Sequence, residues 1–382
     1  MNAAERRKFL GQFGAVSAAA LLPSGIAHAI YCNSGTPARR TNSLFIDSLG
    51  GPGDYMDDTK RPLSAATWQA IEESGLDAVN LTVSGVGSYA TNFNETLENI
   101  AYWNGQISGG GFRSIRSASD LGHAVIGVGC ARQLGLIYGF QDATPLGEDL
   151  NRVDLFWNLG VRIFQLTYNR RNLVGDGCLE PGNAGLSEFG RKLVAKLNER
   201  RALIDLSHAG ERTTLEAIEA SKAPIAISHT GCAALAPLPR NKTDNELKKL
   251  ADKGGYVGIY LMPFLRSKGQ PMAADLIAHL EHAIDVCGED HVGIGSDGVI
   301  SPIAVTPEFK KKFADEINER RKRGISAPGE DPNVYTFIPD LNRADRFARI
   351  GELLAARGHS AARIDKVLGG NFARLLKEVW GA

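Results

Sequence analysis

Three short apolar runs of this sequence each end in a serine followed by a side chain that could bind a metal ion. ALIDLSH ends at His208, PIAISH at His229 and HVGIGSD at Asp297. If these runs are parallel strands of one barrel, their carboxyl ends point into a shared cup where the three side chains converge. Imidazole together with carboxylate suits zinc or a similar divalent ion. The pattern therefore predicts a metal site at the carboxyl ends of the strands.

The alternative is that these histidines only pack in the core or lie on the surface. The other six are in the N-terminal segment, at the starts of strands or on helices: His28, His123, His291, His279, His282 and His359. Two of the eight histidines follow serine at a strand end, and Asp297 repeats the pattern. We therefore favour a polar active site over packing.

Eight apolar runs alternate with helical patterns and predict the elements that position these side chains. The segment 186–197 has apolar residues at helical spacing, and Thr243-x-x-Glu246 forms a capping box ahead of a helix that stops at Gly254. About eight strand–helix units favour a (β/α)8 barrel over a doubly wound open sheet. No Gly-rich dinucleotide or phosphate-binding fingerprint follows the first run, which weakens the open-sheet alternative. The runs are 44–46, 78–83, 135–140, 161–167, 202–206, 224–227, 256–261 and 291–295.

The motifs also carry a family resemblance. LIDLSHAGERTTLEAIEASKAPIAISHTGCAALAPLPRNKTDNELKKLADKGGYVGIY resembles the centre of the membrane (renal-type) dipeptidase family, peptidase family M19. GVRIFQLTYNRRN, GLSEFGRKLVAKLN, HVGIGSD and VLGGNFARLLKEVW also fit, in the family's order. The resemblance implies a (β/α)8 TIM barrel of the amidohydrolase-like, metal-dependent hydrolase type. It also implies two zinc ions in the cup and hydrolysis of dipeptides, including those with a D-residue in second position.

The resemblance assigns roles to four residues. His208 and His229 match the histidines that bind one zinc. Asp297 matches the aspartate that binds the other zinc and handles the proton. Arg240, in the PRN segment, matches the arginine that grips the substrate carboxylate, and a guanidinium suits bidentate pairing with a free C-terminus. The alternative for Arg240 is a solvated loop charge.

Four positions depart from the family pattern. The first-strand motif D-G-H-N-D is here Asp47 to Gly51, with Leu49 for the metal-binding histidine and Gly51 for the metal-binding aspartate. Gln141 stands in place of the zinc-bridging glutamate, and Tyr168 in place of a substrate-contacting histidine. A neutral amide does not bridge two cations as a carboxylate does.

We therefore expect a degenerate first metal site and one ion rather than two. The ion would be held by His208 and His229, with the Gln141 side-chain oxygen and Asp297 as further candidate ligands. Zinc is the expected ion, and another divalent ion or none are the alternatives. Asp54 on the same loop is a conceivable replacement ligand, although GDYMDD reads more simply as a solvated acidic turn.

The segment after Asp297 is longer than the family requires. It contains a charged helical stretch over 307–323 and then a Pro/Gly-rich stretch. Because it leaves the active face of the last strand, it could act as a lid over the cup, and a solvated surface excursion is an equal alternative.

The N-terminus predicts export. ERRKFL carries twin arginines, Arg6 and Arg7, and a modest apolar run leads to a small-x-small site at AHA. Residues 1–29 thus resemble a twin-arginine signal, followed by one domain over 30–382 that would work in the periplasm. Disulfides among Cys32, Cys130, Cys178, Cys232 and Cys287 are left open by the sequence, and Cys130 and Cys287 could equally be small buried residues.

Charge and hydropathy exclude some partners. The chain of 382 residues has 43 basic and 43 acidic residues, so it lacks the footprint of a nucleic-acid or anionic-membrane binder. No apolar stretch predicts a transmembrane segment. A homodimer is possible.

Taken together, the residues and the resemblance predict a periplasmic metallo-dipeptidase-like hydrolase acting on a dipeptide or a small peptide-derived substrate. Arg240 and Tyr168 would contact the substrate, and Asp297 and Tyr168 would take part in catalysis. A diverged enzyme that tailors a secreted peptide metabolite, or a non-catalytic peptide-binding barrel, are the alternatives.

Export offers a first test. Replacing both Arg6 and Arg7 with lysine should leave uncleaved precursor in the cytoplasm, because twin arginines are what the folded-protein pathway reads. Fractionation followed by immunoblotting measures this. Normal arrival of the variant in the periplasm would show that the signal assignment is wrong.

Overall fold

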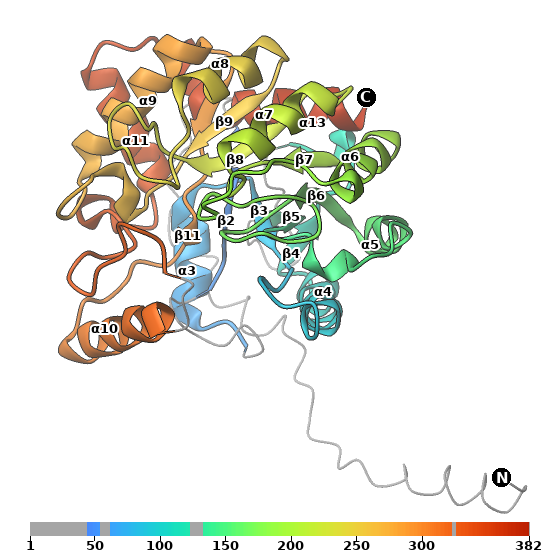
Figure 1. Cartoon of the computed structure of the whole chain (residues 1–382). Helices are drawn as coiled ribbons and strands as arrows, with labels where there is room; N and C mark the ends of the chain where they lie inside the picture. The colour runs from blue at the N-terminus through green and yellow to red at the C-terminus, as the bar shows by residue number, and fades with distance from the viewer. Residues whose placement is uncertain (1–43, 54–61, 123–132, 323–325, 382) are drawn as a thin grey trace, which may run out of the picture.

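The computed structural model describes residues 44–53, 62–122, 133–322 and 326–381. Its centre is a ring of parallel strands in the order β1-β3-β5-β6-β7-β8-β9-β10, with β4 (Phe112–Ser114) paired alongside β5 (Figure 1). Each predicted run overlaps one of these strands. The ring strands are β1 (Ile46–Asp47), β3 (Ala78–Thr82), β5 (Leu134–Phe140), β6 (Val161–Gln165), β7 (Leu203–Asp205), β8 (Ala226–Thr230), β9 (Tyr256–Ile259) and β10 (Val292–Ile294).

Ser48 brings the last strand back to the first. Its backbone N–H donates to Ile294 O at 3.0 Å, and its hydroxyl lies 2.7 Å from Ser228 O and 2.9 Å from Ile294 O. Just beyond, β2 (Gly50–Gly51) pairs in parallel with β11 (Gly298–Val299). These bonds confirm the predicted (β/α)8 barrel, and the open-sheet alternative is wrong.

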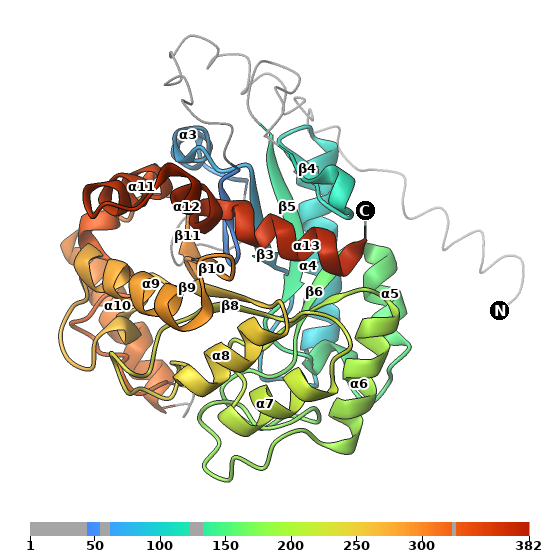
Figure 2. The same ribbon diagram turned by 90° about the horizontal axis from the view of Figure 1, so that it is seen from above.

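Helices surround the strands, as the view down the barrel shows (Figure 2). The capping box of Thr243 and Glu246 is present, and Gly254 adopts a φ of +78° where the chain turns after that helix. The α-helices are α3 (Ala65–Ser74), α4 (Asn92–Ser108), α5 (Arg152–Leu159), α6 (Glu188–Glu199), α7 (Glu211–Ala220), α8 (Asp244–Asp252), α9 (Ala273–Cys287), α10 (Pro307–Lys322), α11 (Arg346–Ala356), α12 (Ala361–Asp365) and α13 (Asn371–Trp380). Short turns are η1 (Ala118–Asp120), η2 (Thr144–Leu146), η3 (Pro263–Leu265), η4 (Pro339–Leu341) and η5 (Lys366–Gly370).

The C-terminal helix α13 closes one end of the barrel (Figure 2). Its apolar side chains, among them Phe372 and Leu376, form a single buried cluster with residues from the starts of the strands, such as Ile46, Ala78 and Leu203. Burying this apolar surface stabilises the fold at roughly 25 cal/mol per Å². Because α13 blocks the amino ends of the strands, access to the barrel is from their carboxyl ends.

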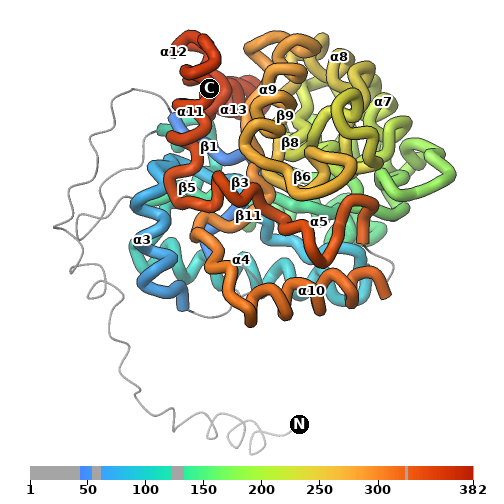
Figure 3. The backbone as a smooth tube through the Cα atoms, turned by 90° about the vertical axis from the view of Figure 1, so that its left-hand side faces the viewer, coloured from blue at the N-terminus to red at the C-terminus, as the bar shows by residue number. Residues whose placement is uncertain are grey.

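Helix α10 lies at the end of the molecule opposite α13 (Figure 3). The predicted helix is confirmed as far as Lys322, since Arg323 lies outside the described residues. Its Phe313 is fully buried, and Phe309 and Phe313 contact Tyr335 and Phe337, whose rings stack at 5.0 Å. Aromatic contacts therefore anchor the helix, while most of its residues are exposed, and the lid and the surface excursion both stay predictions.

Two further expectations concern cysteines and membranes. Cys178, Cys232 and Cys287 are free thiols, and Cys287 is buried, which agrees with the alternative of a small buried residue. Cys32, Cys130, Asp54 and the signal lie outside the described residues. Within the described ranges, no helix combines the length and apolar character needed to cross a bilayer.

Asp47 ties the end of β1 to the loop after β10. Its Oδ1 accepts from the N–H groups of Ser296 at 2.8 Å and Leu49 at 3.2 Å, and its Oδ2 accepts from the Ser296 hydroxyl at 2.5 Å. The side chain is buried, and burial raises its pKa to about 7 although these bonds and the charge of Arg346 lower it. Ionisation of Asp47 therefore opposes folding.

The raised pKa of Asp47 predicts a pH-dependent stability. The folded value lies above the unfolded value of about 4, so this contribution is complete below about pH 4 and is lost as the pH rises through about 7. Raising the pH from about 5 to about 8 should lower the free energy of unfolding of the wild type more than that of Asp47→Asn. The difference should be roughly 1.4 kcal/mol for each pH unit in this range over which the folded Asp47 stays protonated while the unfolded one is ionised. Urea unfolding at the two pH values measures the difference.

Asp252→Asn is the control for that experiment. The Asp252 side chain is 55% exposed and pairs with Lys248, so its variant should follow the wild type. Parallel pH profiles for the wild type and Asp47→Asn would contradict the assignment.

Candidate active site

Two imidazoles lie side by side at the open end of the barrel. His208 follows β7 and His229 is part of β8, and their exposed fractions are 4% and 0%. The ring centroids are 5.0 Å apart in an edge-to-face arrangement. The structure thus brings together the two histidines that the sequence pattern singled out.

Hydrogen bonds fix which ring nitrogen of each histidine carries the proton. His208 Nδ1 lies 2.7 Å from Asn169 Oδ1, an acceptor, so Nδ1 donates and Nε2 is bare. His229 Nδ1 lies 2.8 Å from the hydroxyl of Ser228, whose own proton goes to Asp205 Oδ2 at 2.5 Å. His229 therefore also donates through Nδ1 and presents a bare Nε2.

Both imidazoles are neutral. Burial lowers the pKa of His208 and of His229 well below the usual value, and the positive charge of Arg240 lowers both further. His229 Nε2 is buried and has no hydrogen-bond partner among the described residues. A buried bare nitrogen of this kind is costly unless a ligand occupies it.

The two imidazoles fit a single divalent ion. Their Nδ1 groups are held by neighbouring side chains, which is the usual arrangement behind metal-binding histidines. Over the described ranges, however, no three His, Cys, Asp or Glu side chains form a group that could hold a metal ion. Asp297 therefore does not complete a three-residue set with the imidazoles, which remain the candidate ligand pair.

Asp297 lies between β10 and β11, at the rim of the cup. Its φ is +55°, a left-handed conformation that is uncommon for residues other than glycine. Its backbone N–H donates to Leu49 O at 2.8 Å, and its Oδ1 accepts from Gln141 Nε2 at 3.3 Å. Burial raises its pKa to about 6, while Arg240 and the Gln141 bond lower it. A carboxyl group with that pKa can exchange a proton near neutral pH.

Gln141 and Tyr168 also reach this end of the barrel. Gln141 directly follows β5, and its amide nitrogen points to Asp297. Tyr168 follows β6 and stacks on His208 with a centroid separation of 4.1 Å. Burial raises the pKa of Tyr168, so its hydroxyl is neutral at physiological pH.

Arg240 is buried, with an exposed fraction of 2%, so the reading as a solvated loop charge is wrong. Its Nη1 donates to Ser207 O at 2.7 Å, and its Nη2 has no partner among the described residues. Its guanidinium carbon lies 5.8 Å from the ring centroid of Tyr260. An unpartnered guanidinium arm in a buried site is suited to an anionic ligand such as a carboxylate.

Sequence reasoning missed the residues that hold the histidines in place. Asn169 directly follows Tyr168 and accepts from His208. Asp205 accepts from the hydroxyl and backbone of both Ser207 and Ser228. The serine before each predicted ligand was the available signal, because each of these serines bonds a buried aspartate.

The segment after β1, where the family pattern has metal ligands, is bonded to the loop after β10. Leu49 is buried, with an exposed fraction of 3%. Leu49 O accepts from Asp297 N, and Gly51 O accepts from Ile300 N at 3.0 Å. A Cβ on Gly50 would lie 2.5 Å from Asp47 Oδ2, so glycine is needed there. The segment therefore holds Asp297 in place instead of supplying ligands.

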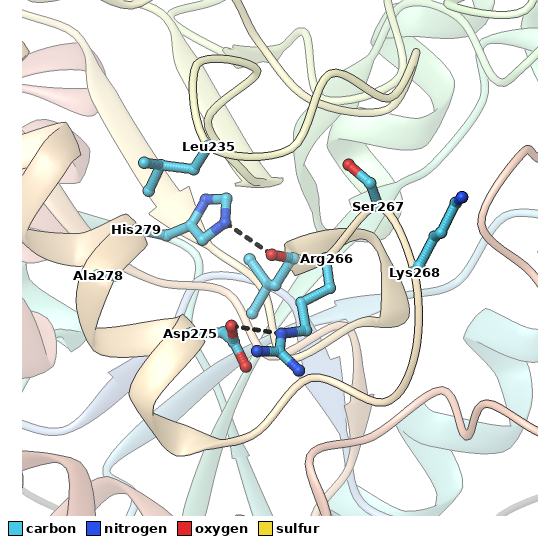
Figure 4. Close-up of a pocket in the computed structure, with 8 residues that line it drawn as sticks. Leu235, Arg266, Ser267, Lys268, Asp275, Ala278 and His279 are labelled. Atoms are coloured by element: carbon cyan, nitrogen blue, oxygen red, sulfur yellow. Dashed lines mark hydrogen bonds and ion pairs between the residues drawn. The ribbon is translucent and has the colours of Figure 1, made fainter.

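A surface cavity of about 570 Å³ lies elsewhere, between η3 and α9 (Figure 4). Arg266 and Asp275 pair across it at 2.8 Å, and His279 bonds Leu265 O at 3.0 Å and Cys232 N at 2.9 Å. His279 is thus a satisfied core histidine, as expected. None of the predicted site residues lines this cavity, so it is separate from the active-site cup.

Fold and site together define a barrel of the metal-dependent hydrolase class. The family model for membrane dipeptidase (peptidase family M19) matches residues 63–311. The chain belongs to this family, as the sequence resemblance indicated.

Similar proteins agree with this assignment. Dipeptidase tcpJ of Claviceps purpurea is 28% identical over 247 residues, covering 64% of this chain and 50% of that protein. The chain thus spans about half the length of the curated relatives it matches. An amidohydrolase from Pseudomonas aeruginosa is 30% identical with a TM-score of 0.72, covering 94% of this chain and 99% of that one. A metallo peptidase from Rhodobacter sphaeroides, bound to a phosphinate mimic of L-Ala-D-Ala, shares the fold at 20% identity, a TM-score of 0.70 and coverage of 89% and 100%.

The imidazole pair predicts the metal content. We expect no more than one tightly bound divalent ion per chain, since two bare Nε2 atoms offer one pair of ligands. His208→Ala or His229→Ala should release it, whereas His282→Ala should not, because His282 pairs with Asp244 on a helix surface. Elemental analysis of purified protein measures this, with circular dichroism to confirm folding. Two tightly held ions would contradict the prediction.

Proposed function

We propose that this protein is a periplasmic dipeptidase-like hydrolase that holds one metal ion, most simply zinc, on His208 and His229. The observation that carries the proposal is the pair of neutral imidazoles with bare Nε2 atoms beside the unpartnered arm of Arg240. A non-catalytic binding barrel would not need to keep that pair. The twin arginines of the N-terminus support the periplasmic location.

The substrate would be a dipeptide or a small peptide-derived compound with a free carboxylate. Arg240 would bind the carboxylate through Nη2 and orient the scissile amide. His208 and His229 would hold a divalent ion, which would supply Lewis acidity to the site. Asp297 would take a proton from the attacking water as the water oxygen bonds to the carbonyl carbon. It would return that proton to the amine nitrogen as the C–N bond breaks, as its pKa of about 6 allows. The neutral Tyr168 hydroxyl would donate to the carbonyl oxygen as negative charge develops on it.

The residues that replace family metal ligands favour an unusual substrate. Leu49, Gly51 and Gln141 occupy positions where the resemblance implies ligands of a first metal site. A member without that site would hydrolyse ordinary dipeptides poorly and could serve a tailoring step on a secreted peptide metabolite. We therefore keep that second activity as the alternative, and it uses the same site residues.

A dipeptide panel tests the proposed activity. We expect L,L- and L,D-dipeptides to be cleaved slowly. Tyr168 replaces the family's substrate-contacting histidine, and losing one preorganised group at a developing oxyanion costs about a hundredfold in rate. Losing a metal ion costs more. Asp297→Asn should abolish the residual activity. Turnover by the wild type in the usual enzyme range, about 10 per second, would contradict the expected impairment.

A restored variant provides the matched comparison. Leu49→His, Gly51→Asp and Gln141→Glu together should raise both zinc content and dipeptide hydrolysis. A Cβ on residue 51 would lie 3.0 Å from Leu81 Cδ1, a contact that a methyl group can relieve by a small shift. Absence of any hydrolysis in wild type and restored variant alike would favour the binding-barrel alternative.

A further inference from the structure

The backbone carbonyls on either side of His208 are both held by basic side chains. Ser207 O accepts from Arg240 Nη1 at 2.7 Å, and Ala209 O accepts from Lys242 Nζ at 2.5 Å. Arg240 and Lys242 lie two residues apart in the loop that leads from β8 to α8. A single segment therefore grips the backbone before and after this histidine.

The ammonium of Lys242 is fixed in one geometry. Lys242 and Glu246 are buried, each with an exposed fraction of 2%. Lys242 Nζ also donates to Thr214 Oγ1 of α7 at 2.8 Å, and it forms an ion pair with Glu246 Oε1 of α8 at 3.2 Å. Because an ammonium has three hydrogens to donate and no acceptor, these contacts and the one to Ala209 O match its capacity. Lys242 thus links the end of β7 to two helices.

The backbone of Lys242 is bonded to the segment after the second histidine. Its N–H donates to Gly231 O at 3.0 Å, and its carbonyl accepts from Ala233 N at 2.9 Å. Gly231 follows His229 by two residues. Lys242 therefore contacts the chain just beyond each imidazole, with its side chain at one and with its backbone at the other.

Stability alone does not account for this buried ion pair. Moving two charges out of water costs free energy that their attraction often fails to exceed, and uncharged replacements of similar size are often as stable. Glu246 also accepts from the N–H of Thr243 at the start of α8, but the oxygen of a glutamine can accept that bond as well. A need for position explains the pair better than a need for stability.

We propose that Lys242 is a positioning residue that, together with Arg240, fixes the backbone of His208 and sets the spacing between the imidazole pair and the arginine arm. The inference rests on the proposed function for its effect on metal binding, whereas the placement of His208 does not depend on that function. The spacing matters because a metal ion and a substrate carboxylate must be held within about 0.5 Å of the productive geometry.

A double variant separates position from charge and from stability. Lys242→Met/Glu246→Gln removes one positive and one negative charge, so the net charge beside the imidazoles is unchanged. We expect a free energy of unfolding close to that of the wild type. We also expect about tenfold weaker zinc binding, the usual effect of losing a group that supports a metal ligand. Urea unfolding and competition with a chromophoric chelator measure the two quantities.

Lys248→Met/Asp252→Asn is the matched control. This pair has the same spacing along the chain and an N–O distance of 2.9 Å, but its side chains are 66% and 55% exposed. The control should bind zinc as the wild type does. A folded Lys242→Met/Glu246→Gln variant that binds zinc as tightly as a zinc-binding wild type overturns the proposal.

Nuclear magnetic resonance of the imidazole nitrogens decides the placement without a metal ion. In chelator-treated protein with nitrogen-15 in histidine, the ring resonances of His208, assigned with His208→Ala, should shift in the double variant. They should stay in place in the control. If the double variant does not fold, Thr214→Val replaces it, since this change removes only the hydroxyl that accepts from Lys242. Unmoved His208 resonances in the folded variant overturn the proposal. If the wild type binds no zinc, the proposed metal function fails, and these resonances alone decide whether Lys242 positions His208.

Discussion

The structure depends on how the end of the first strand is bonded to the end of the eighth. Ser48 bonds the backbone of β10, Asp47 bonds Ser296, and Leu49 O accepts from the N–H of Asp297. A parallel barrel needs this pairing because open strand ends would leave buried polar groups without partners. The same bonds hold Asp297 at a φ of +55°, a conformation that costs of order 1–3 kcal/mol and persists only where the surroundings enforce it. The hydrogen bonds that close the barrel therefore also hold Asp297, the proposed base, in place.

Buried hydrogen bonds of serine side chains also hold the two histidines in place. Ser207 and Ser228 share the buried Asp205, and Ser228 sets the tautomer of His229. A carboxylate buried with a full set of donors costs little compared with an unpaired one, and it rigidifies what it contacts. The hydrogen bonds to their Nδ1 atoms thus orient the imidazoles and leave both Nε2 atoms without a proton.

The sequence predicted the strands and the convergence of the histidines because both follow from short-range patterns. Apolar runs of strand length mark the barrel, and parallel connections place the ends of the strands at one edge. The partners of Arg240 and Arg320 could not be predicted in this way. Arg240 is charged and lies in a loop, which normally indicates exposure, yet it is buried in contact with Ser207 and near the ring of Tyr260. Arg320 pairs with Glu330, which lies beyond the end of the helix in the Pro/Gly-rich stretch, where no periodic pattern predicts a contact.

The balance of charge in the cup supports the proposed single-ion site. Two divalent ions carry four positive charges and need several carboxylates nearby to offset the loss of hydration. Here Gln141 and Gly51 are neutral where the family pattern has carboxylates, and the guanidinium of Arg240 acts on both imidazoles. Asp297 is the carboxylate at the rim, and part of its charge is already balanced by Arg240 and Arg320. Leu49 lacks a ligand atom, and Gly51 and Gln141 lack the negative charge that the family pattern has there. Under the proposed function these changes act together, because they weaken the first metal site and leave a positive field suited to an anionic substrate.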